Sequence, residues 1–583
     1  MANNSKTKTI AVVAGNITNE FCKDLMESIR CAIPQGGDYH LIILPGEVLV
    51  NEDSNVGIWQ YDAVFNGVYS LASQCEPDGI IFAVGSMGWK VSGEELHAFV
   101  ERFKGIPKVL ISSWDDDYVT VNYDNESGIS EAIDYLVNVN GFTSICMLGG
   151  EDYNPDALDR KEVFIRCLEN NGLPFSEHFY ETTDMSSHTE AAAKRLLDNN
   201  PNVEAIFCVN DTSARGLYNV MESRGLTPGK DIVVFGFDNT RLSSEMSPSL
   251  TSIGPVDTTL GQRAVELLID MMNGREVSSD KVKTRLYGRD SFPYEMYQYT
   301  NKELLDVDRE FIYRMFDDCF YRYSSAAVRR SAVDLRRLYY EFISRILTAY
   351  KNRFMPVEEF DEIGNMIDIF FENGAMEYTD ASKLITCIQK LQNALNIIQK
   401  SLAVTTVINR LFLRMRDDCI KQICENNIDQ RNITSGNIKR LRNHLVIGMD
   451  YAGDKDKTLA AYIRNMDLIC VENGSFFMFD EPIERGESDD IVYPEDVYMK
   501  CFIKDGEMNV IPKERQKRKT RDLLYQISEV SHLNCLVVYP IIYRNTTYGL
   551  FFCELNDTIY TVGSFVATTI GMVMHQLEHD NDK

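Results

Sequence analysis

From residue 8 to about 295, short apolar runs alternate with longer stretches in which apolar residues recur every three or four positions. Short β-branched runs bounded by turn residues predict buried parallel strands, and the longer stretches predict amphipathic helices. The predicted strands are 9–15, 39–44, 79–84, 108–112, 119–125, 144–148, 178–182, 205–209 and one that begins at 231. The predicted helices are 21–33, 94–103, 128–139, 158–171, 189–199, 213–224 and 260–272. This alternation predicts doubly wound parallel sheets, and the segment is long enough for two lobes.

After about residue 302 the pattern changes to helices alone. From residue 380 the apolar positions follow a 4-3-4-3-4 spacing and then, after a phase shift near 403, a second register. These positions are Leu384, Ile388, Leu391, Leu395, Ile398 and Leu402, followed by Val404, Ile408, Leu411 and Met415. Such a seam is typical of a two-stranded coiled coil, so we expect helix 380–427 to pair with a second copy in a homodimer. A helical bundle within the chain would bury the same stripe.

The last segment, about 436–583, mixes helices and strands. A helix over 438–449 precedes predicted strands at 468–470, 475–479, 497–503, 534–543 and 547–554, and a helix over 565–577 closes the chain. The last two strands are separated by a short polar turn, which predicts a hairpin. We therefore expect an α+β domain after the all-α segment.

Composition limits the class of protein. At 583 residues, 44% hydrophobic and 25% charged, the chain is too long for one core and has the balance of a folded protein. Its formal charge of -28 repels phosphate backbones and anionic bilayers, so we expect neither nucleic acid nor a membrane as a direct partner. No apolar run of about 20 residues and no leader sequence is evident, which favours a cytoplasmic protein. The cysteines and histidines are scattered, and we expect no metal and no cofactor.

The most suggestive stretch is 231–239. A buried apolar run ends at Gly236 and is followed by Phe237, Asp238 and Asn239. Ligands of open α/β sheets bind just outside the carboxyl ends of the strands. Asp238 is therefore the first candidate for contact with a ligand, and an ordinary turn after the strand is the structural alternative.

Several motifs stand in a fixed order around that stretch. They are Asp124-Asn-x-x-Gly128, Leu148-Gly-Gly150, Arg160, Asn210-Asp-x-x-Ala-x-Gly216, Gly236-Phe-Asp-Asn239 and Leu260-Gly-x-x-Ala264. This series resembles the effector-binding core of the lactose-repressor family, a type 1 periplasmic-binding-protein fold. The resemblance implies a domain over 1–300, with lobe 1 at about 8–124 plus 254–285 and lobe 2 at about 125–253. It also implies that the lobes close on a small molecule, usually a sugar or related metabolite.

The resemblance implies roles for particular residues. Asp238 and Asn210 would bond ligand hydroxyls, and Arg160 would offer a forked donor. The weaker candidates are Asp124 and Asn125 where the chain crosses between lobes, Asn16 and Ser86 at the ends of first-lobe strands, and Trp114 or Tyr153 as rings that stack on a sugar.

Each polar candidate has a structural alternative. Asn210 and Asp211 could cap the helix that begins at 213. Asp124 and Asn125 could stabilise a turn at the hinge. Arg160 could pair with an acid on its own helix.

The whole chain suggests a sensor. The helical linker, 301–435, leads to a domain at 436–583 whose element order resembles a GAF-type sensor domain. This combination resembles the input half of bacterial proteins that end in a diguanylate cyclase, and the chain stops where that output domain would start. We expect a non-enzymatic cytoplasmic sensor that relays lobe closure to a GAF-like module and then to a missing output domain or a partner protein.

Other functions fit less well. A lactose-repressor-type transcriptional regulator that lacks its own helix-turn-helix is the main alternative, since few residues precede the first strand. A solute-binding protein of a transporter is disfavoured by the lack of a leader. An enzyme is disfavoured because no nucleophile–base pair, phosphate-binding glycine loop or metal cluster is evident.

Overall fold

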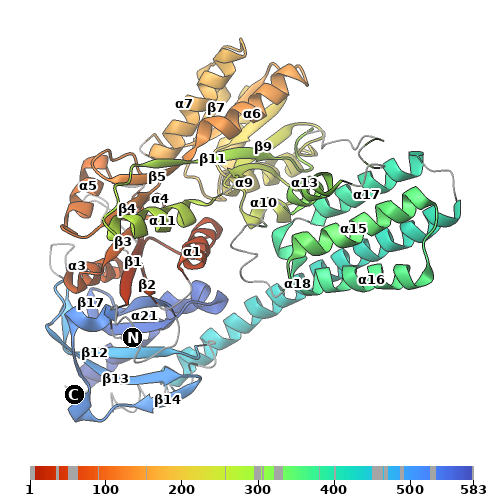
Figure 1. The fold of residues 1–583 in the computed structure, drawn as a ribbon. Helices are drawn as coiled ribbons and strands as arrows, with labels where there is room; N and C mark the ends of the chain where they lie inside the picture. Colours follow the sequence, from red (N-terminus) through yellow and green to blue (C-terminus); the bar gives the residue numbers. More distant parts are fainter. Residues whose placement is uncertain are drawn as a thin grey trace.

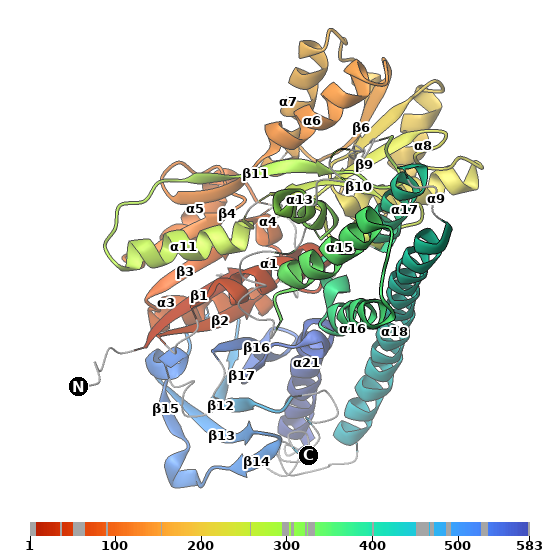
Figure 2. The same ribbon diagram turned by 45° about the vertical axis from the view of Figure 1, so that its right-hand side comes forward.

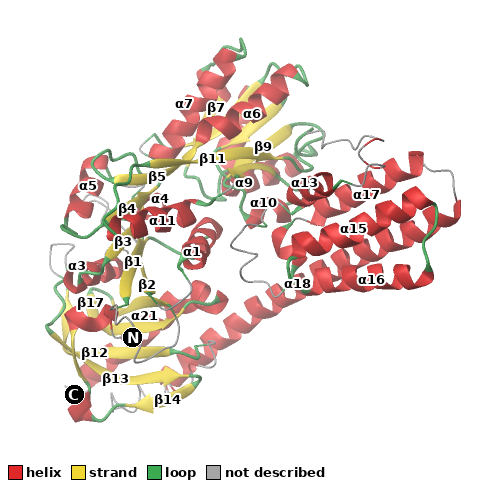
Figure 3. Ribbon diagram, viewed as in Figure 1, coloured by secondary structure: helices red, strands yellow, loops and turns green. Residues whose placement is uncertain are grey.

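The computed structural model describes residues 7–34, 38–49, 64–88, 91–152, 154–256, 258–293, 302, 304, 308–320, 323, 333–379, 381–398, 402–449, 464, 466, 471–485, 491–525 and 534–580. Two α/β lobes, a helical bundle and a C-terminal α/β unit follow one another along the chain (Figure 1). Strands occupy the lobes and the C-terminal unit, and the described part of the bundle between them consists of helices joined by loops, without a strand (Figure 3).

The first lobe is built on a parallel sheet in the order β2-β1-β3-β4-β5. Its strands are β1 (Lys8–Ala14), β2 (Tyr39–Pro45), β3 (Gly79–Ala83), β4 (Lys108–Ile111) and β5 (Val119–Asp124). Alternate residues of each strand enter different cores, as the two-residue period of a strand requires. Ile10 and Val12 pack with α1 (Glu20–Ala32) and α11 (Leu260–Met272), whereas Ala11 and Val13 pack with α3 (Ser70–Cys75) and α5 (Gly93–Glu101).

The second lobe has the parallel order β7-β6-β8-β9-β10. Its strands are β6 (Ile145–Gly150), β7 (Tyr180–Thr183), β8 (Ala205–Cys208), β9 (Val233–Phe237) and β10 (Thr251–Pro255). Its helices are α6 (Asn125–Asn138), α7 (Pro155–Asn170), α8 (Glu190–Asn199), α9 (Asp211–Ser223) and α10 (Arg241–Glu245). The predicted two-lobed parallel α/β fold is confirmed.

One strand belongs to both lobes. β11 (Asp280–Tyr287) pairs in parallel with β5 through its first half and antiparallel with β10 through its second half. The chain therefore connects the lobes by continuous backbone hydrogen bonding as well as by the covalent crossing after β5.

The helical segment forms an intramolecular bundle. It comprises α13 (Arg309–Cys319), α15 (Leu335–Asn352), α16 (Val357–Glu372), the 3-10 turn η4 (Ala375–Tyr378), α17 (Ala381–Ile398) and α18 (Leu402–Met449). The stripe predicted as a coiled-coil seam lies in the core of this bundle: Leu384, Leu391, Leu395, Ile408 and Leu411 are all at most 3% exposed.

The expectation that helix 380–427 is a two-stranded coiled coil is therefore wrong for this stripe. The phase shift near 403 marks the end of one helix and the start of the next, and the second helix packs back on the first. The side chains of Ile398 and Leu402 lie outside the described residues. α18 also continues through the separately predicted helix 438–449, so the two are a single helix of 48 residues.

The C-terminal unit extends the sheet of lobe 1. Its strands are β12 (Gly474–Glu484), β13 (Asp496–Lys504), β14 (Glu507–Val510), β15 (Lys517–Lys519), β16 (Cys535–Tyr543) and β17 (Thr546–Glu554), and α21 (Asp557–Asp580) follows. The order β13-β12-β17-β16 is antiparallel, with β14 and β15 both pairing to β13. β16 then pairs in parallel with β2, so that Leu536 lies opposite Ile42.

The predicted hairpin of the last two strands is confirmed, and the predicted strand at 468–470 lies outside the described residues. Sequence alone did not indicate the junction of β16 with β2. Among the described helices, none combines the length and apolar character needed to cross a bilayer.

Candidate functional site

Two adjoining cavities lie between the lobes. Cavity A has a volume of about 430 Å³ and is lined from lobe 1 by α1 and the end of β3, and from lobe 2 by the ends of β6, β7, β8 and β9. Cavity B has a volume of about 390 Å³ and lies beside α1, α11 and the loop after β9. Phe21 and Asp238 line both cavities. The two cavities are therefore parts of one cleft.

Asp238 occupies the place predicted for it, at the end of β9. Its φ is 93°, and its backbone N–H donates to the Ile253 carbonyl at 2.8 Å. The preceding Gly236 is required because a Cβ there would collide with the Asp211 carboxylate. A positive φ in a residue other than glycine costs free energy, and such residues concentrate at functional sites.

Arg160 of α7 forms a buried ion pair with Asp238. Its Nη2 lies 3.0 Å from Asp238 Oδ1, and its Nη1 donates to the Val209 carbonyl at 2.6 Å. The guanidinium also stacks on the Phe237 ring, with Cζ at 3.7 Å from the ring centroid. Burial raises the pKa of Asp238, and the arginine opposes that rise. The arginine thus reaches across to β9, and the alternative of a purely local pair on its own helix does not account for it.

Asp156 belongs to the same cluster and was missed by sequence analysis. It stands four residues before Arg160 on α7 and accepts a hydrogen bond from Ser112 of lobe 1. Burial raises the pKa of Asp156 to about 6, against the lowering effect of Arg160. The i, i+4 spacing from Arg160 was the signal that could have found it. Its contact with Ser112 joins the two lobes directly.

Asn210 and Asp211 perform structural tasks at the start of α9. Asn210 Oδ1 accepts from the Ser213 N–H at 2.8 Å, which is an N-cap, and its Nδ2 donates to the Met185 carbonyl at 3.0 Å. Asp211 is fully buried and accepts from the Thr240 N–H and the Ser252 hydroxyl, and burial raises its pKa to about 7. Asn210 also lines cavity A, so capping and ligand contact are compatible for this residue.

The two hinge candidates lie away from the cleft. Asp124 caps α6 by accepting from the Ser127 N–H at 3.4 Å. Asn125 is 2% exposed and its Nδ2 donates to Asp159 Oδ2 at 2.5 Å. Neither residue lines cavity A or B. Their contacts are those of the structural alternative, a stabilised turn at the crossing between lobes.

Of the two candidates at the ends of first-lobe strands, one lines the cleft and the other does not. Ser86 lines cavity A, while its hydroxyl accepts from the Gly15 N–H at 2.9 Å. Asn16 does not line either cavity; its Oδ1 accepts from the Thr18 N–H at 2.8 Å in the turn before α1. Trp114 lines a further cavity, and Tyr153 lies outside the described residues.

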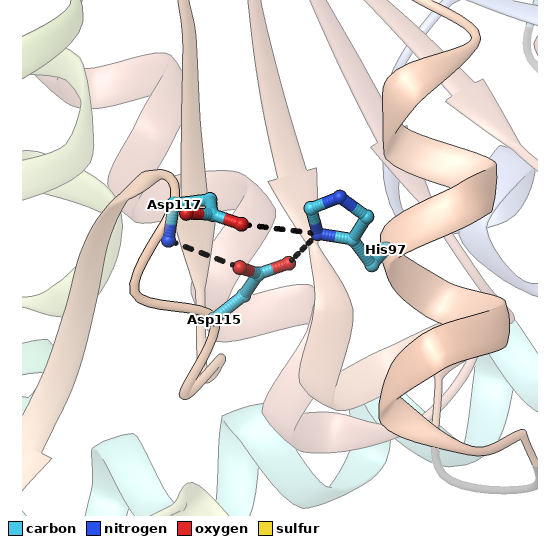
Figure 4. Close-up of side chains that lie close together, drawn as sticks. All are labelled: His97, Asp115 and Asp117. Carbon is cyan, nitrogen blue, oxygen red and sulfur yellow. Dashed lines mark hydrogen bonds and ion pairs between the residues drawn. The ribbon is translucent and has the colours of Figure 1, made fainter.

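That further cavity, cavity C, has a volume of about 530 Å³ and shares Gly85, Asn154 and Asp156 with cavity A. On its rim, His97 Nδ1 lies 2.8 Å from Asp115 Oδ2 and 3.9 Å from Asp117 Oδ2 (Figure 4). The hydrogen bond to Asp115 raises the pKa of His97.

The three ligand-type atoms on this rim lie within 4.8 Å of one another, and His97 and Asp115 are 18 residues apart in sequence. That separation is why sequence analysis found no metal cluster. The three side chains are of types that can hold a divalent cation. Without a cation, the same contacts join α5 to the loop between β4 and β5.

Comparisons with known proteins agree with this architecture. Residues 133–292 match the family model described as "Periplasmic binding protein-like domain". The chain is 28% identical over 284 residues to catabolite control protein A of Priestia megaterium, a match that covers 48% of this chain and 79% of that protein. It is 26% identical over 276 residues to the HTH-type transcriptional repressor PurR of Vibrio vulnificus (strain CMCP6), covering 46% of this chain and 76% of that protein.

Among solved structures, a complex of the transcriptional regulator CelR with cellobiose matches with a TM-score of 0.41 and 19% identity, covering 49% of this chain and 85% of that one. The two curated relatives are named as a catabolite control protein and as a transcriptional repressor. The first half of the chain is a two-lobed, periplasmic-binding-protein-like core similar to the effector-binding core of LacI-family regulators.

Proposed function

We propose that this protein is a ligand-sensing regulator whose two lobes close on a small polyhydroxylated metabolite, such as a sugar, in cavities A and B. The observation that carries this proposal is the buried Arg160–Asp238 pair, which lines a cavity to which both lobes contribute. A fixed charge pair offers a ligand hydroxyl both a strong donor and a strong acceptor.

The rest of cavity A has matching chemistry. Its lining includes hydroxyl and amide groups from both lobes: Asn19, Ser86, Asn154, Thr183, Ser186, Ser187, Asn210 and Thr212. Such groups both donate and accept, as sugar hydroxyls do. A volume of about 430 Å³ lies within the usual range for small-molecule sites. Phe21 supplies an aromatic ring at the junction of the two cavities.

The mode of output is the second part of the proposal. The names of the relatives support regulation of transcription, and the core would serve as its effector-binding part. A relay through the bundle to the C-terminal unit, as a GAF-like module with an output domain or partner protein, is the second candidate. The observation that favours it is the β2–β16 junction, which makes the C-terminal unit continuous with lobe 1. Homodimerisation stays a prediction.

A thermal-shift screen of neutral sugars, polyols, nucleosides and amino acids tests the binding function. A ligand at 100 times its Kd stabilises the folded state by about 2.7 kcal/mol, which gives a readily measured rise in melting temperature. Asp238→Ala should abolish this rise. Asp198→Ala, an equal loss of charge at an exposed site on α8, should leave it unchanged.

The readout is the ligand-induced change in melting temperature within each variant, so a lower starting stability of Asp238→Ala does not confound it. A compound that stabilises the parent and Asp238→Ala equally would place the binding site elsewhere. A screen without any stabilising compound would refute the proposed function.

A further inference from the structure

Cavity B has a boundary that the two lobes alone do not provide. Lobe 1 contributes Asp24 of α1, and lobe 2 contributes the loop from Asp238 to Arg241. Among the other lining residues is Glu377 of η4, which belongs to the helical bundle. Three parts of the chain therefore meet at one cavity.

Other contacts place the bundle at this position. Figures 1 and 2 both show α13 and α17 beside the lobe that carries α9 and α10. Asp318 of α13 interacts electrostatically with Arg285 of β11. Lys383 of α17 interacts electrostatically with Arg289. Burial is the larger cause of the lowered pKa of Lys383.

The same contacts reach the loop that carries Asp238. Arg289 donates through Nη2 to Asn239 Oδ1 at 2.6 Å and through Nη1 to the Leu250 carbonyl at 2.8 Å. Asn239, like Asp238, has a positive φ. Arg289 thus fixes the loop 238–241 by a hydrogen bond from the side of the bundle. Glu377 lines cavity B together with the same loop.

The charges lining cavity B are mainly negative. Asp24 and Glu377 supply carboxylates, and Asp238 adds a third that is paired with Arg160. Among the described residues that line the cavity, Arg241 supplies the guanidinium, and it is paired with Glu245 at 2.6 Å. Glu377 is exposed on the bundle side. A ligand group entering this cavity therefore meets acceptors of negative charge and finds little to neutralise an anion.

We infer that Glu377 is a specificity-determining residue of the cleft, and that it selects neutral or amino sugars against sugar acids and sugar phosphates. Its carboxylate accepts a hydrogen bond from a ligand hydroxyl or ammonium group in cavity B. The ligand then contacts lobe 1, lobe 2 and the bundle at once, so its binding fixes the bundle relative to the lobes. This inference rests on the proposed function, because it assigns the ligand class and the coupling of the same cleft.

Two matched series of probes test the selection. D-glucose, D-glucosamine and D-glucuronate share one ring and carry zero, positive and negative charge, and the corresponding D-galactose series differs at one hydroxyl. Affinities are measured by calorimetry on the full chain for the parent protein, Glu377→Gln and Glu372→Gln. Glu372 ends α16, is exposed, does not line cavity A or B, and provides the same change of charge on the same bundle.

The parent should bind the neutral or amino member of a series and discriminate against its uronate. Glu377→Gln should reduce that discrimination at least fivefold, and Glu372→Gln should leave it unchanged. Hydrogen exchange should show protection of the backbone of η4 on addition of the bound sugar to the parent.

The outcomes separate the two proposals. Discrimination that is equal in the parent and Glu377→Gln, together with loss of binding in Asp238→Ala, would refute this inference and leave the proposed function intact. Tight binding of a uronate by the parent would also refute it. If no member of either series binds, the inference fails, and the thermal-shift screen decides the proposed function separately.

Discussion

Replacing Arg160 with methionine removes a buried guanidinium and leaves its partner in place. Arg160 is 3% exposed, and the Asp238 side chain is 10% exposed. In Arg160→Met the carboxylate loses its counter-ion at 3.0 Å, the Val209 carbonyl loses a donor at 2.6 Å, and the Phe237 ring loses a stacked cation. Methionine fills most of the volume, so the effect is chiefly electrostatic.

The size of the effect follows from these contacts. Removing one member of a buried ion pair costs about 3–5 kcal/mol because an uncompensated charge stays buried. The cost should depend on pH, because Arg160 is the group that lowers the pKa of Asp238 and its removal lets that pKa rise further. A carboxyl whose pKa is higher in the folded state loses stability as pH rises from its unfolded value of about 4 through its folded value. The loss should therefore be larger at pH 8 than at pH 5.

Hydrogen exchange of the β9 amides measures the local cost, since a chain with several structural units does not unfold as one two-state system. Asp238→Asn in the Arg160→Met background should restore at least about 2 kcal/mol at pH 8, because the amide needs no counter-ion. If Arg160→Met lowers the local stability of β9 equally at pH 5 and pH 8, and Asp238→Asn restores none of that stability, the Arg160–Asp238 pair does not act as an electrostatic unit.

Two further predictions concern stability. Asp156→Asn should stabilise the protein by up to about 3 kcal/mol at pH 7.5 and by little at pH 4. The reason is that the folded pKa of about 6 lies above the ordinary value, so the ionised carboxylate is disfavoured in the folded protein. Melting temperatures of the parent and the variant across pH 4–8 measure this effect, and parallel curves would contradict it. Leu391→Ala should destabilise the bundle by about 2–5 kcal/mol without changing the sedimentation coefficient, whereas exposed Leu413→Ala should cost at most about 0.5 kcal/mol. A change of oligomeric state in Leu391→Ala would restore the coiled-coil interpretation of that stripe.

The parts of the fold that follow from local pattern were predictable from sequence. The apolar run before Gly236 and the alternation around it predicted β9 and its neighbours, because strands and helices of a parallel sheet have different periods. The stripe through Leu391 was assigned to the wrong partner, because a 4-3 spacing is equally satisfied by a neighbouring helix of the same chain. Only the arrangement of α17 against α18 distinguishes the two. The pairing of Leu536 with Ile42 is a contact between distant segments, and no local pattern specifies it.

The candidate site was predictable to the same degree. Asp238 was found because it ends a buried strand, and Arg160 because a family motif marks it. Asp156 has only its i, i+4 spacing from Arg160 as a local sign, and Glu377 has none. Asp156 matters through its contact with Ser112 in the other lobe, and Glu377 through the position of the bundle. The role of a residue that acts across an interface between structural units can be recognised only when the positions of those units are known.

That placement limits how closure of the cleft can be transmitted. The C-terminal unit shares both a sheet and a hydrophobic core with lobe 1, where Val13 and Phe82 pack in the same cluster as Phe477 and Val538. The bundle, in contrast, faces lobe 2 at Arg285 and Arg289. α18 runs from the bundle to the C-terminal unit, where it packs against α21 (Figure 2). In the relay proposed above, a change in the angle between the lobes would displace α18 against α21, because a helix of 48 residues resists bending. The relay proposed above would therefore reach the C-terminal unit at the contact between these two helices.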